Sequence, residues 1–267
     1  MSEFNGKKVL ITGGASGIGK TMGRLALSRQ AELVIWDIDQ VKINATIAEF
    51  STKGNVSAYC VDVSSPEQVK IFADKVKKEI GQIDILINNA GIVRGKFFNE
   101  HNHDDITKTM FVNTLAPMYI TLEFLPEMIH RKSGHICNIA SLAGLISNPK
   151  MSVYAASKWA VIGWSDSVRL EMKQLNTNIH VTTVNPYYIN TGMFDGVKSR
   201  IPLLKTEKVA HAIIRAIEKD KTFLSMPWSM RFIRLCQGLF GVRGFDAIVG
   251  NMVGVYKTME HFSGHNK

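Results

Sequence analysis

A glycine-rich turn between an apolar run and a helical pattern constrains this chain more than any other feature. The apolar run, residues 7–12, reads KKVLIT and leads directly into Gly13-Gly14-Ala15-Ser16-Gly17-Ile18-Gly19. Apolar residues then recur at helical spacing from Lys20 to Arg29. The sequence therefore predicts a buried strand, a turn and a helix, because glycine accepts positive φ angles and leaves room for close contact.

Such a turn suits a phosphate ligand, since the following helix directs free N–H groups and the positive end of its dipole toward it. The Gly13-x-x-x-Gly17-x-Gly19 spacing differs from the common G-x-G-x-x-G of dinucleotide sites. Asp37 ends the next apolar run, 18 positions after Gly19, close to where an acid binds a cofactor ribose. The acid favours dinucleotide binding over a strand–helix connection without a ligand.

Length and composition favour a single domain over residues 1–267, with 226–267 as a C-terminal, substrate-side extension. No linker or repeat divides the 267 residues, of which 45% are hydrophobic. Three widely spaced cysteines, a polar N-terminus and the lack of a membrane-length apolar run indicate a cytoplasmic protein with reduced, buried cysteines. The net charge of +9 is scattered along the chain, so nucleic acid is not an expected partner.

Strands and helices alternate along the rest of the chain. The apolar runs at 33–36, 56–61, 83–87, 135–139, 179–184 and 222–225 read as strands, and the segments 40–53, 66–80, 104–131, 154–174 and 206–219 read as helices, with Pro117 expected to bend the longest. Continuous apolar strands between helices predict a doubly wound parallel α/β sheet of the Rossmann type. Ligands bind at the carboxyl ends of such strands, so the residues that follow each strand are the candidates.

Tyr154 and Lys158 lie four residues apart on a predicted helix, so their side chains can converge on one ligand. A phenol with a pKa of about 10 is a poor base at neutral pH. One nearby ammonium supplies about 4 kcal/mol toward ionising it, whereas burial acts in the opposite direction. Ser141, at the end of the preceding strand, offers a hydroxyl to the same place. Together with the glycine turn, these residues favour proton transfer over an ordinary aromatic and a surface lysine.

With these motifs in this order, the chain resembles the short-chain dehydrogenases/reductases of the single-domain branch over about residues 5–225. The motifs are Thr12-Gly13-x-x-x-Gly17-x-Gly19, Asn88-Asn89-Ala90-Gly91, Asn113, Ser141 and Tyr154-x-x-x-Lys158. The resemblance implies an oxidoreductase that transfers a hydride between a nicotinamide cofactor and a small alcohol or ketone.

The resemblance also implies a role for each matching residue. Tyr154 is the general acid/base, Lys158 also binds the nicotinamide ribose, Ser141 orients the substrate, and Asn113 holds a water on the proton path. The expected cofactor-binding residues are Gly13, Ser16, Gly17, Ile18, Gly19, Asp37, Asp62, Val63, Asn89, Ala90, Gly91, Tyr154, Lys158, Pro186, Ile189 and Thr191.

Two features narrow the expected cofactor and substrate. Asp37 favours NAD(H) over NADP(H), because a carboxylate repels a 2′-phosphate and Ser16 adds no compensating charge. The Asn190-Thr191-Gly192 sequence and the pattern from Phe245 to Phe262 are similar to the retinol and hydroxysteroid dehydrogenase branch. That similarity implies a lipophilic retinoid, steroid or fatty alcohol. Tyr187 and Tyr188 stand where the family usually has glycine after proline, which makes this loop bulkier.

Residues 228–240 predict an amphipathic helix. Arg231, Arg234 and Gln237 fall on one face, opposite an apolar face made of Trp228, Phe232, Leu235, Cys236, Leu239 and Phe240. The segment is too short to span a bilayer. Its apolar face is compatible with a peripheral membrane contact, with the core, or with a second copy of the chain in a homodimer or homotetramer.

Two other functions remain compatible with these residues. A 3-oxoacyl thioester reductase suits the positive charge but is disfavoured by Asp37, and a non-catalytic nucleotide-binding sensor has no need of Ser141, Tyr154 and Lys158. No metal is expected, because the polar residues at 101–105 read as a capping loop before a helix.

Overall fold

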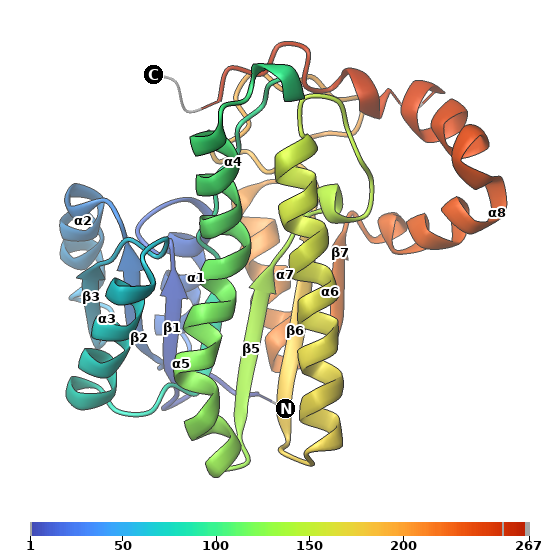
Figure 1. Ribbon diagram of the computed structural model, residues 1–267. Coiled ribbons are helices and arrows are strands. Elements are labelled where there is room, and N and C mark those ends of the chain that lie inside the picture. Colours follow the sequence, from blue (N-terminus) through green and yellow to red (C-terminus); the bar gives the residue numbers. More distant parts are fainter. Residues whose placement is uncertain (1, 253, 265–267) are drawn as a thin grey trace.

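The computed structural model describes residues 2–252 and 254–264, and it contains one seven-stranded parallel sheet (Figure 1). The strand order is β3-β2-β1-β4-β5-β6-β7. The strands are β1 (Lys8–Thr12), β2 (Glu32–Asp37), β3 (Val56–Cys60), β4 (Ile85–Asn88), β5 (Gly134–Ile139), β6 (Ile179–Pro186) and β7 (Phe223–Met226). This arrangement confirms the predicted doubly wound Rossmann sheet.

Helices cover both faces of the sheet. Successive side chains of β1 therefore enter apolar clusters on opposite faces. Val9 and Ile11 point into one apolar cluster, whereas Leu10 points into the other. The first cluster lies under α1 (Gly17–Leu27), α2 (Gln40–Phe50) and α7 (Thr206–Glu218), and the second under α3 (Pro66–Glu79), α5 (Ala116–His130) and α6 (Ser152–Gln174). Burial on both faces explains why these strands read as continuous apolar runs.

A chain of buried polar side chains crosses three neighbouring strands of the sheet. The Asn88 amide donates to Oδ1 of Asn138 at 2.8 Å, and the Asn138 amide donates to Oγ of Ser165 at 2.9 Å. Ser165 in turn bonds the Thr183 hydroxyl at 2.7 Å. These bonds join β4, β5 and β6 to α6, and therefore fix the carboxyl end of β4 against the helix that carries Tyr154.

The long helix expected from 104 to 131 is divided by a π-helical turn. It comprises α4 (His103–Met110), the π-helical turn Phe111–Leu115 and α5. The Ala116 N–H donates five residues back to the Phe111 carbonyl, and Pro117, which has no N–H to donate, follows within the first turn of α5. The π-helical turn lies directly before the turn that contains Pro117, the residue expected to bend the helix, and it carries Asn113.

Two smaller expectations had opposite outcomes. Asn102 accepts a hydrogen bond from the Asp105 N–H at 2.8 Å, which confirms a capping loop before α4. The prediction that all three cysteines are buried is wrong, because Cys60 is exposed at the end of the edge strand β3 while Cys137 is buried.

The segment after β7 lies over the carboxyl edge of the sheet and projects beside it (Figure 1). A 3₁₀ turn, Trp228–Phe232, leads into α8 (Ile233–Phe245), in which Gly241 has a non-helical φ of +59°. The sequence analysis placed Gln237 on the polar face of the helix, away from the apolar residues. That placement is wrong as a solvent-facing position, since the Gln237 amide faces the protein and donates to the Leu145 carbonyl at 2.8 Å. Among the described residues, no helix is long and apolar enough to cross a membrane.

The amino edge of the sheet contains a buried histidine. His135 bonds Ser2 through Nδ1 at 2.9 Å and Thr182 through Nε2 at 2.8 Å. Burial lowers the pKa of His135 to about 3, His180 acts in the same direction, and Asp220 opposes them. The unfolded chain binds this proton below a pH of about 6.5, so stability falls as the pH decreases toward 3.

We expect His135→Gln to remove about 2.5 kcal/mol of the stability difference between pH 7 and pH 4.5. Glutamine keeps polar groups for Ser2 and Thr182 but does not titrate. The measurement is urea unfolding at both pH values for wild type, His135→Gln and His130→Gln, whose exposed histidine is the control. An equal pH dependence of the free energy of unfolding in all three proteins would contradict the lowered pKa of His135.

Candidate active site

The glycine turn between β1 and α1 brings the helix N-terminus against the end of the first strand. Gly13 and Gly17 have φ angles of +62° and +52°. A Cβ at Gly19 would overlap the carbonyl oxygen of Gly13. The Ser16 side chain makes no capping hydrogen bond, so the amides at the start of α1 remain available to a phosphate.

The turn is fixed to the end of β4 by reciprocal hydrogen bonds. The Thr12 hydroxyl oxygen accepts from the backbone N–H groups of Asn89 and Ala90, both at 3.0 Å. The Asn89 amide donates to the carbonyl oxygens of Thr12 at 2.9 Å and Gly13 at 3.1 Å. Asn89 and Ala90 therefore hold the turn in place and also border the cavity beside it.

Asp37 lies at the other side of the turn, where β2 ends. One carboxylate oxygen accepts from the Ala15 N–H at 3.0 Å and the other from the Asp39 N–H at 3.2 Å. Asp62 and Val63 line the same pocket as Asp37. The sequence analysis missed Lys42, which lines this pocket too and whose Nζ lies 2.9 Å from the Asp39 carboxylate. A lysine three residues after an N-cap aspartate was the available signal.

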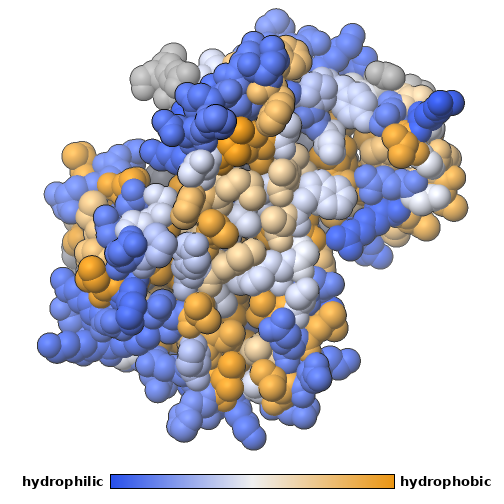
Figure 2. Space-filling view, viewed as in Figure 1, coloured by the Kyte–Doolittle hydropathy of each residue, from blue (hydrophilic) through white to orange (hydrophobic). Residues whose placement is uncertain are grey.

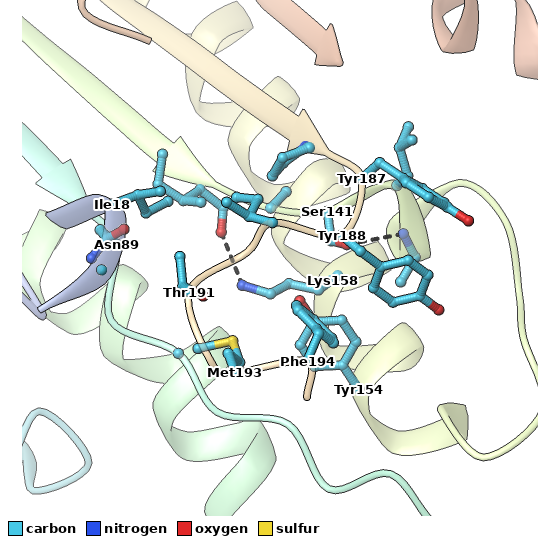
Figure 3. A pocket seen from close by; sticks show the side chains of 18 of the residues that line it. Ile18, Asn89, Ser141, Tyr154, Lys158, Tyr187, Tyr188, Thr191, Met193 and Phe194 are labelled. Carbon is cyan, nitrogen blue, oxygen red and sulfur yellow. Dashed lines mark hydrogen bonds between the residues drawn. The ribbon is translucent and has the colours of Figure 1, made fainter. Parts of the chain in front are cut away.

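Ser141, Tyr154 and Lys158 line the cavity beside the glycine turn (Figure 3). This cavity adjoins the pocket that Asp37 lines. Tyr154 and Lys158 are buried on the first turns of α6, and the Lys158 Nζ lies 5.8 Å from the centre of the Tyr154 ring. Nζ also donates to the Ile139 carbonyl at 2.9 Å. Ser141 follows β5 and caps the next turn by accepting from the Ala143 N–H at 3.1 Å.

Burial shifts the two titrating groups in opposite directions. It raises the pKa of Tyr154 to about 12, although the hydrogen bond with Ser141 lowers it. It lowers the pKa of Lys158 to about 8. Both shifts favour the neutral form, as expected when a charged group leaves water. In the protein alone, burial therefore outweighs the lowering of the phenol pKa by Ser141.

Asn113 lies behind the pocket and does not border it. Its Oδ1 accepts from the Ile92 N–H at 2.8 Å, and its Nδ2 donates to the Ile92 carbonyl at 2.9 Å and to Oγ of Ser157 at 3.1 Å. These bonds connect the π-helical turn, the segment after β4 and α6. The side chain that the resemblance assigned to a proton path is thus engaged in direct protein contacts.

The bulky loop after β6 reaches the pocket with both tyrosines buried. Tyr187 and Tyr188 stack edge to face at 4.6 Å between ring centres, and the Tyr187 hydroxyl bonds Ser199 at 2.8 Å. Pro186, Ile189 and Thr191 line the cavity as expected.

Sixteen of the eighteen expected cofactor-binding and catalytic residues, including Ile18 and Ser141, line the two adjoining pockets. Gly19 is a packing residue of the turn and Asn113 lies behind the wall. The two pockets share six lining residues, which are Gly13, Ser16, Lys42, Ala90, Gly91 and Met193. Sequence reasoning missed most of the apolar wall near Tyr154, which includes Ala140, Leu142, Ile146, Met151, Met193, Phe194 and Val255.

Comparison with known proteins agrees with this geometry. The sequence profile of the short chain dehydrogenase family matches residues 7–201. Epidermal retinol dehydrogenase 2 of Mus musculus is 36% identical, over 98% of this chain and 87% of its own. The human 17-beta-hydroxysteroid dehydrogenase 13 is 35% identical, over 93% of this chain and 87% of its own.

Solved structures show the same fold. A short chain dehydrogenase/reductase from Burkholderia phymatum in complex with NAD has a TM-score of 0.81 and 26% identity, covering 88% of this chain and 94% of its own. A short-chain dehydrogenase from Sphingobium yanoikuyae in complex with NADPH has a TM-score of 0.79 and 26% identity, covering 87% and 93%. The chain belongs to the short-chain dehydrogenase family and is an oxidoreductase of that class.

Proposed function

We propose that this chain is an NAD(H)-dependent dehydrogenase of lipophilic alcohols, of the retinoid, steroid or fatty alcohol type, and the matching ketone reductase. The observation that carries the proposal is that Ser141, Tyr154 and Lys158 border one pocket whose remaining wall is largely apolar. The relatives named for retinol and hydroxysteroids support this substrate class.

The residues around the pocket fit a dinucleotide. The free amides of the glycine turn suit its phosphates, and the positive φ angles of Gly13 and Gly17 keep side chains out of their way. Lys158 borders the same pocket, and its ammonium would bind the ribose next to the nicotinamide. The nicotinamide ring, when bound, supplies the hydride acceptor or donor.

The protein's own contribution is orientation and proton transfer. Ser141 holds the substrate oxygen beside Tyr154, whose phenolic oxygen takes the hydroxyl proton in oxidation and returns it in reduction. As the alcohol C–H bond breaks to release a hydride, the O–H proton moves to the Tyr154 phenolate and a carbonyl forms. Because burial raises the pKa of Tyr154, alcohol oxidation becomes faster with rising pH.

Tyr154→Phe is expected to lower turnover at least about 100-fold while leaving NADH affinity nearly unchanged, since only the phenolic oxygen is lost. The assay is NADH formation from primary alcohols of increasing chain length.

In the wild type, kcat/KM rises about two- to fourfold per added methylene until the apolar pocket is full.

Tyr59→Phe is the matched control, because its hydroxyl bonds Glu79 on the surface at 2.8 Å, outside both pockets. If Tyr154→Phe keeps a tenth of the wild-type turnover, Tyr154 is not the proton-transfer group. A flat chain-length profile contradicts the lipophilic substrate.

Asp37 supports NAD(H) as the cofactor. Its carboxylate is held by the Ala15 and Asp39 N–H groups at the end of β2, the strand position from which an acid binds ribose hydroxyls. A 2′-phosphate there would meet the charges of both Asp37 and Asp39. Lys42 already pairs with Asp39 and so offers limited compensation.

We expect Asp37→Ala to lower kcat/KM with NAD by about ten- to a hundredfold, the range for a lost hydrogen bond to a charged group. We expect kcat/KM with NADP to rise or stay constant, so the ratio of kcat/KM with NAD to kcat/KM with NADP decreases. Asp74→Ala, an exposed carboxylate on α3, is the control. Equal kcat/KM for NAD and NADP in the wild type would contradict the cofactor assignment.

We also propose that this enzyme is cytoplasmic and contacts an anionic membrane surface peripherally through residues 228–240. Trp228 and Leu239 are 69% and 71% exposed, and Phe232, Leu235 and Phe240 are exposed as well. Arg231 and Arg234 lie among them, and the Arg231 guanidinium is 4.8 Å from the centre of the Phe232 ring. In Figure 2 apolar and hydrophilic residues lie side by side over the projecting α8 region. Exposed apolar and cationic side chains together are typical of interfacial segments.

The wild type is expected to co-sediment with phosphatidylserine-containing vesicles, and Trp228→Glu/Phe232→Glu to lose at least about tenfold in vesicle affinity, because both apolar insertion and charge attraction weaken. The matched control is Ile71→Glu/Leu175→Glu, which alters equally exposed apolar residues elsewhere. Unchanged binding by the first variant would assign the membrane contact to another surface, and no binding by the wild type would reject it.

A further inference from the structure

Three polar side chains form a buried cluster in the wall of the substrate pocket. Asn148 precedes α6, Tyr188 follows β6, and Thr258 belongs to the C-terminal segment. They are 9%, 7% and 1% exposed, respectively. The cluster has no part in the proton transfer described above, and its other neighbours are mostly apolar.

The hydrogen bonds within this cluster account for every donor and leave one acceptor unused. The Asn148 amide nitrogen donates to Oγ1 of Thr258 at 2.8 Å and to the Tyr188 hydroxyl at 3.0 Å. The Thr258 hydroxyl donates to the Val255 carbonyl at 2.8 Å, and the Tyr188 hydroxyl lies 3.0 Å from Thr258. The Asn148 Oδ1 is buried without a hydrogen-bond partner among the described residues.

The orientation of the amide follows from the same bonds. Reversing Asn148 would place Oδ1 between Thr258 and Tyr188, and Thr258 already donates its proton to Val255. The reversed amide would also bury two N–H donors without partners. The orientation with Oδ1 unpaired therefore gives hydrogen-bond partners to more of the polar groups in the cluster.

An unpaired buried oxygen is costly, and most such groups in folded proteins find a partner. Asn148 lines the same pocket as Tyr154, and Phe194 lies between the two regions. The Phe194 ring centre is 6.2 Å from that of Tyr154 and 5.0 Å from that of Tyr188 (Figure 3). A ligand that reacts at Tyr154 and extends past Phe194 can therefore present a polar group to Asn148.

We propose that Asn148 is a specificity-determining residue whose amide oxygen accepts a hydrogen bond from a second hydroxyl of the substrate, remote from the reacting carbinol. The enzyme then prefers lipophilic diols and hydroxy-ketones to mono-alcohols of the same shape. This inference rests on the proposed dehydrogenase function and adds a second point of recognition to it.

The test compares kcat/KM for substrates that differ only in the distal hydroxyl. Alkane-α,ω-diols of increasing length are measured against primary alcohols of the same carbon number, and a steroid diol against its deoxy analogue. At the matching length, we expect the wild type to favour the diol about tenfold or more, since the mono-alcohol leaves Oδ1 unpaired.

Asn148→Leu replaces the amide with an apolar group of similar size and should reduce the ratio of kcat/KM for the diol to kcat/KM for the mono-alcohol to about one. Tyr188→Phe is the matched variant, because it removes a neighbouring hydroxyl but keeps the Asn148 oxygen, and the preference should persist. A preference that survives in Asn148→Leu overturns the proposal.

If Asn148→Leu does not fold, the comparison of diols with mono-alcohols in the wild type still tests the proposal. Equal kcat/KM for diols and mono-alcohols at every length overturns the inference, and indicates that a water satisfies Oδ1 instead. No turnover of either substrate contradicts the proposed function and is thus distinct from a failure of the Asn148 inference.

Discussion

Gly13 and Gly19 approach each other so closely that no Cβ fits at Gly19, and the position of α1 depends on that contact. The approach directs the first amides of α1 over the turn, where an anion can bind them. Thr12 and Asn89 then fix the turn to the end of β4, and the buried chain from Asn88 to Thr183 continues across the sheet to α6. The glycine turn and the helix with Tyr154 thus belong to one rigid framework.

That framework places two ionisable groups where water is largely excluded. Burial favours neutral Tyr154 and neutral Lys158, so the protein alone holds the phenol ready to donate a proton. Acceptance of a proton requires more positive charge near the phenol. A charged cofactor ring beside Tyr154 is one such source, and the direction of catalysis is therefore linked to the charge state of the bound cofactor.

The parts of the site at the carboxyl ends of strands could be predicted, because these ends meet at one edge of a parallel sheet, whereas the contacts of the loops and the C-terminal segment could not. The glycine turn and the Tyr154–Lys158 pair depend on spacings of a few residues, which helix and strand periodicity determine. Asn148 bonds Thr258 across 110 positions, and Gln237 bonds Leu145 across 92. Periodicity places Gln237 on a face of α8 but does not say which face meets the protein. The π-helical turn that carries Asn113 was missed because its extra residue depends on tertiary contacts as well as on Pro117.

The two ends of the pocket come from different parts of the chain. The proposed nucleotide end is lined mainly by residues between Gly13 and Val112, with Met193 and residues 262–264 at its border, whereas Phe194 and Val255 complete the proposed substrate end. Mutations in the later part of the gene therefore alter what is recognised without disturbing the glycine turn or the sheet. Substrate preference can diverge among descendants of such a protein while the redox chemistry is inherited unchanged.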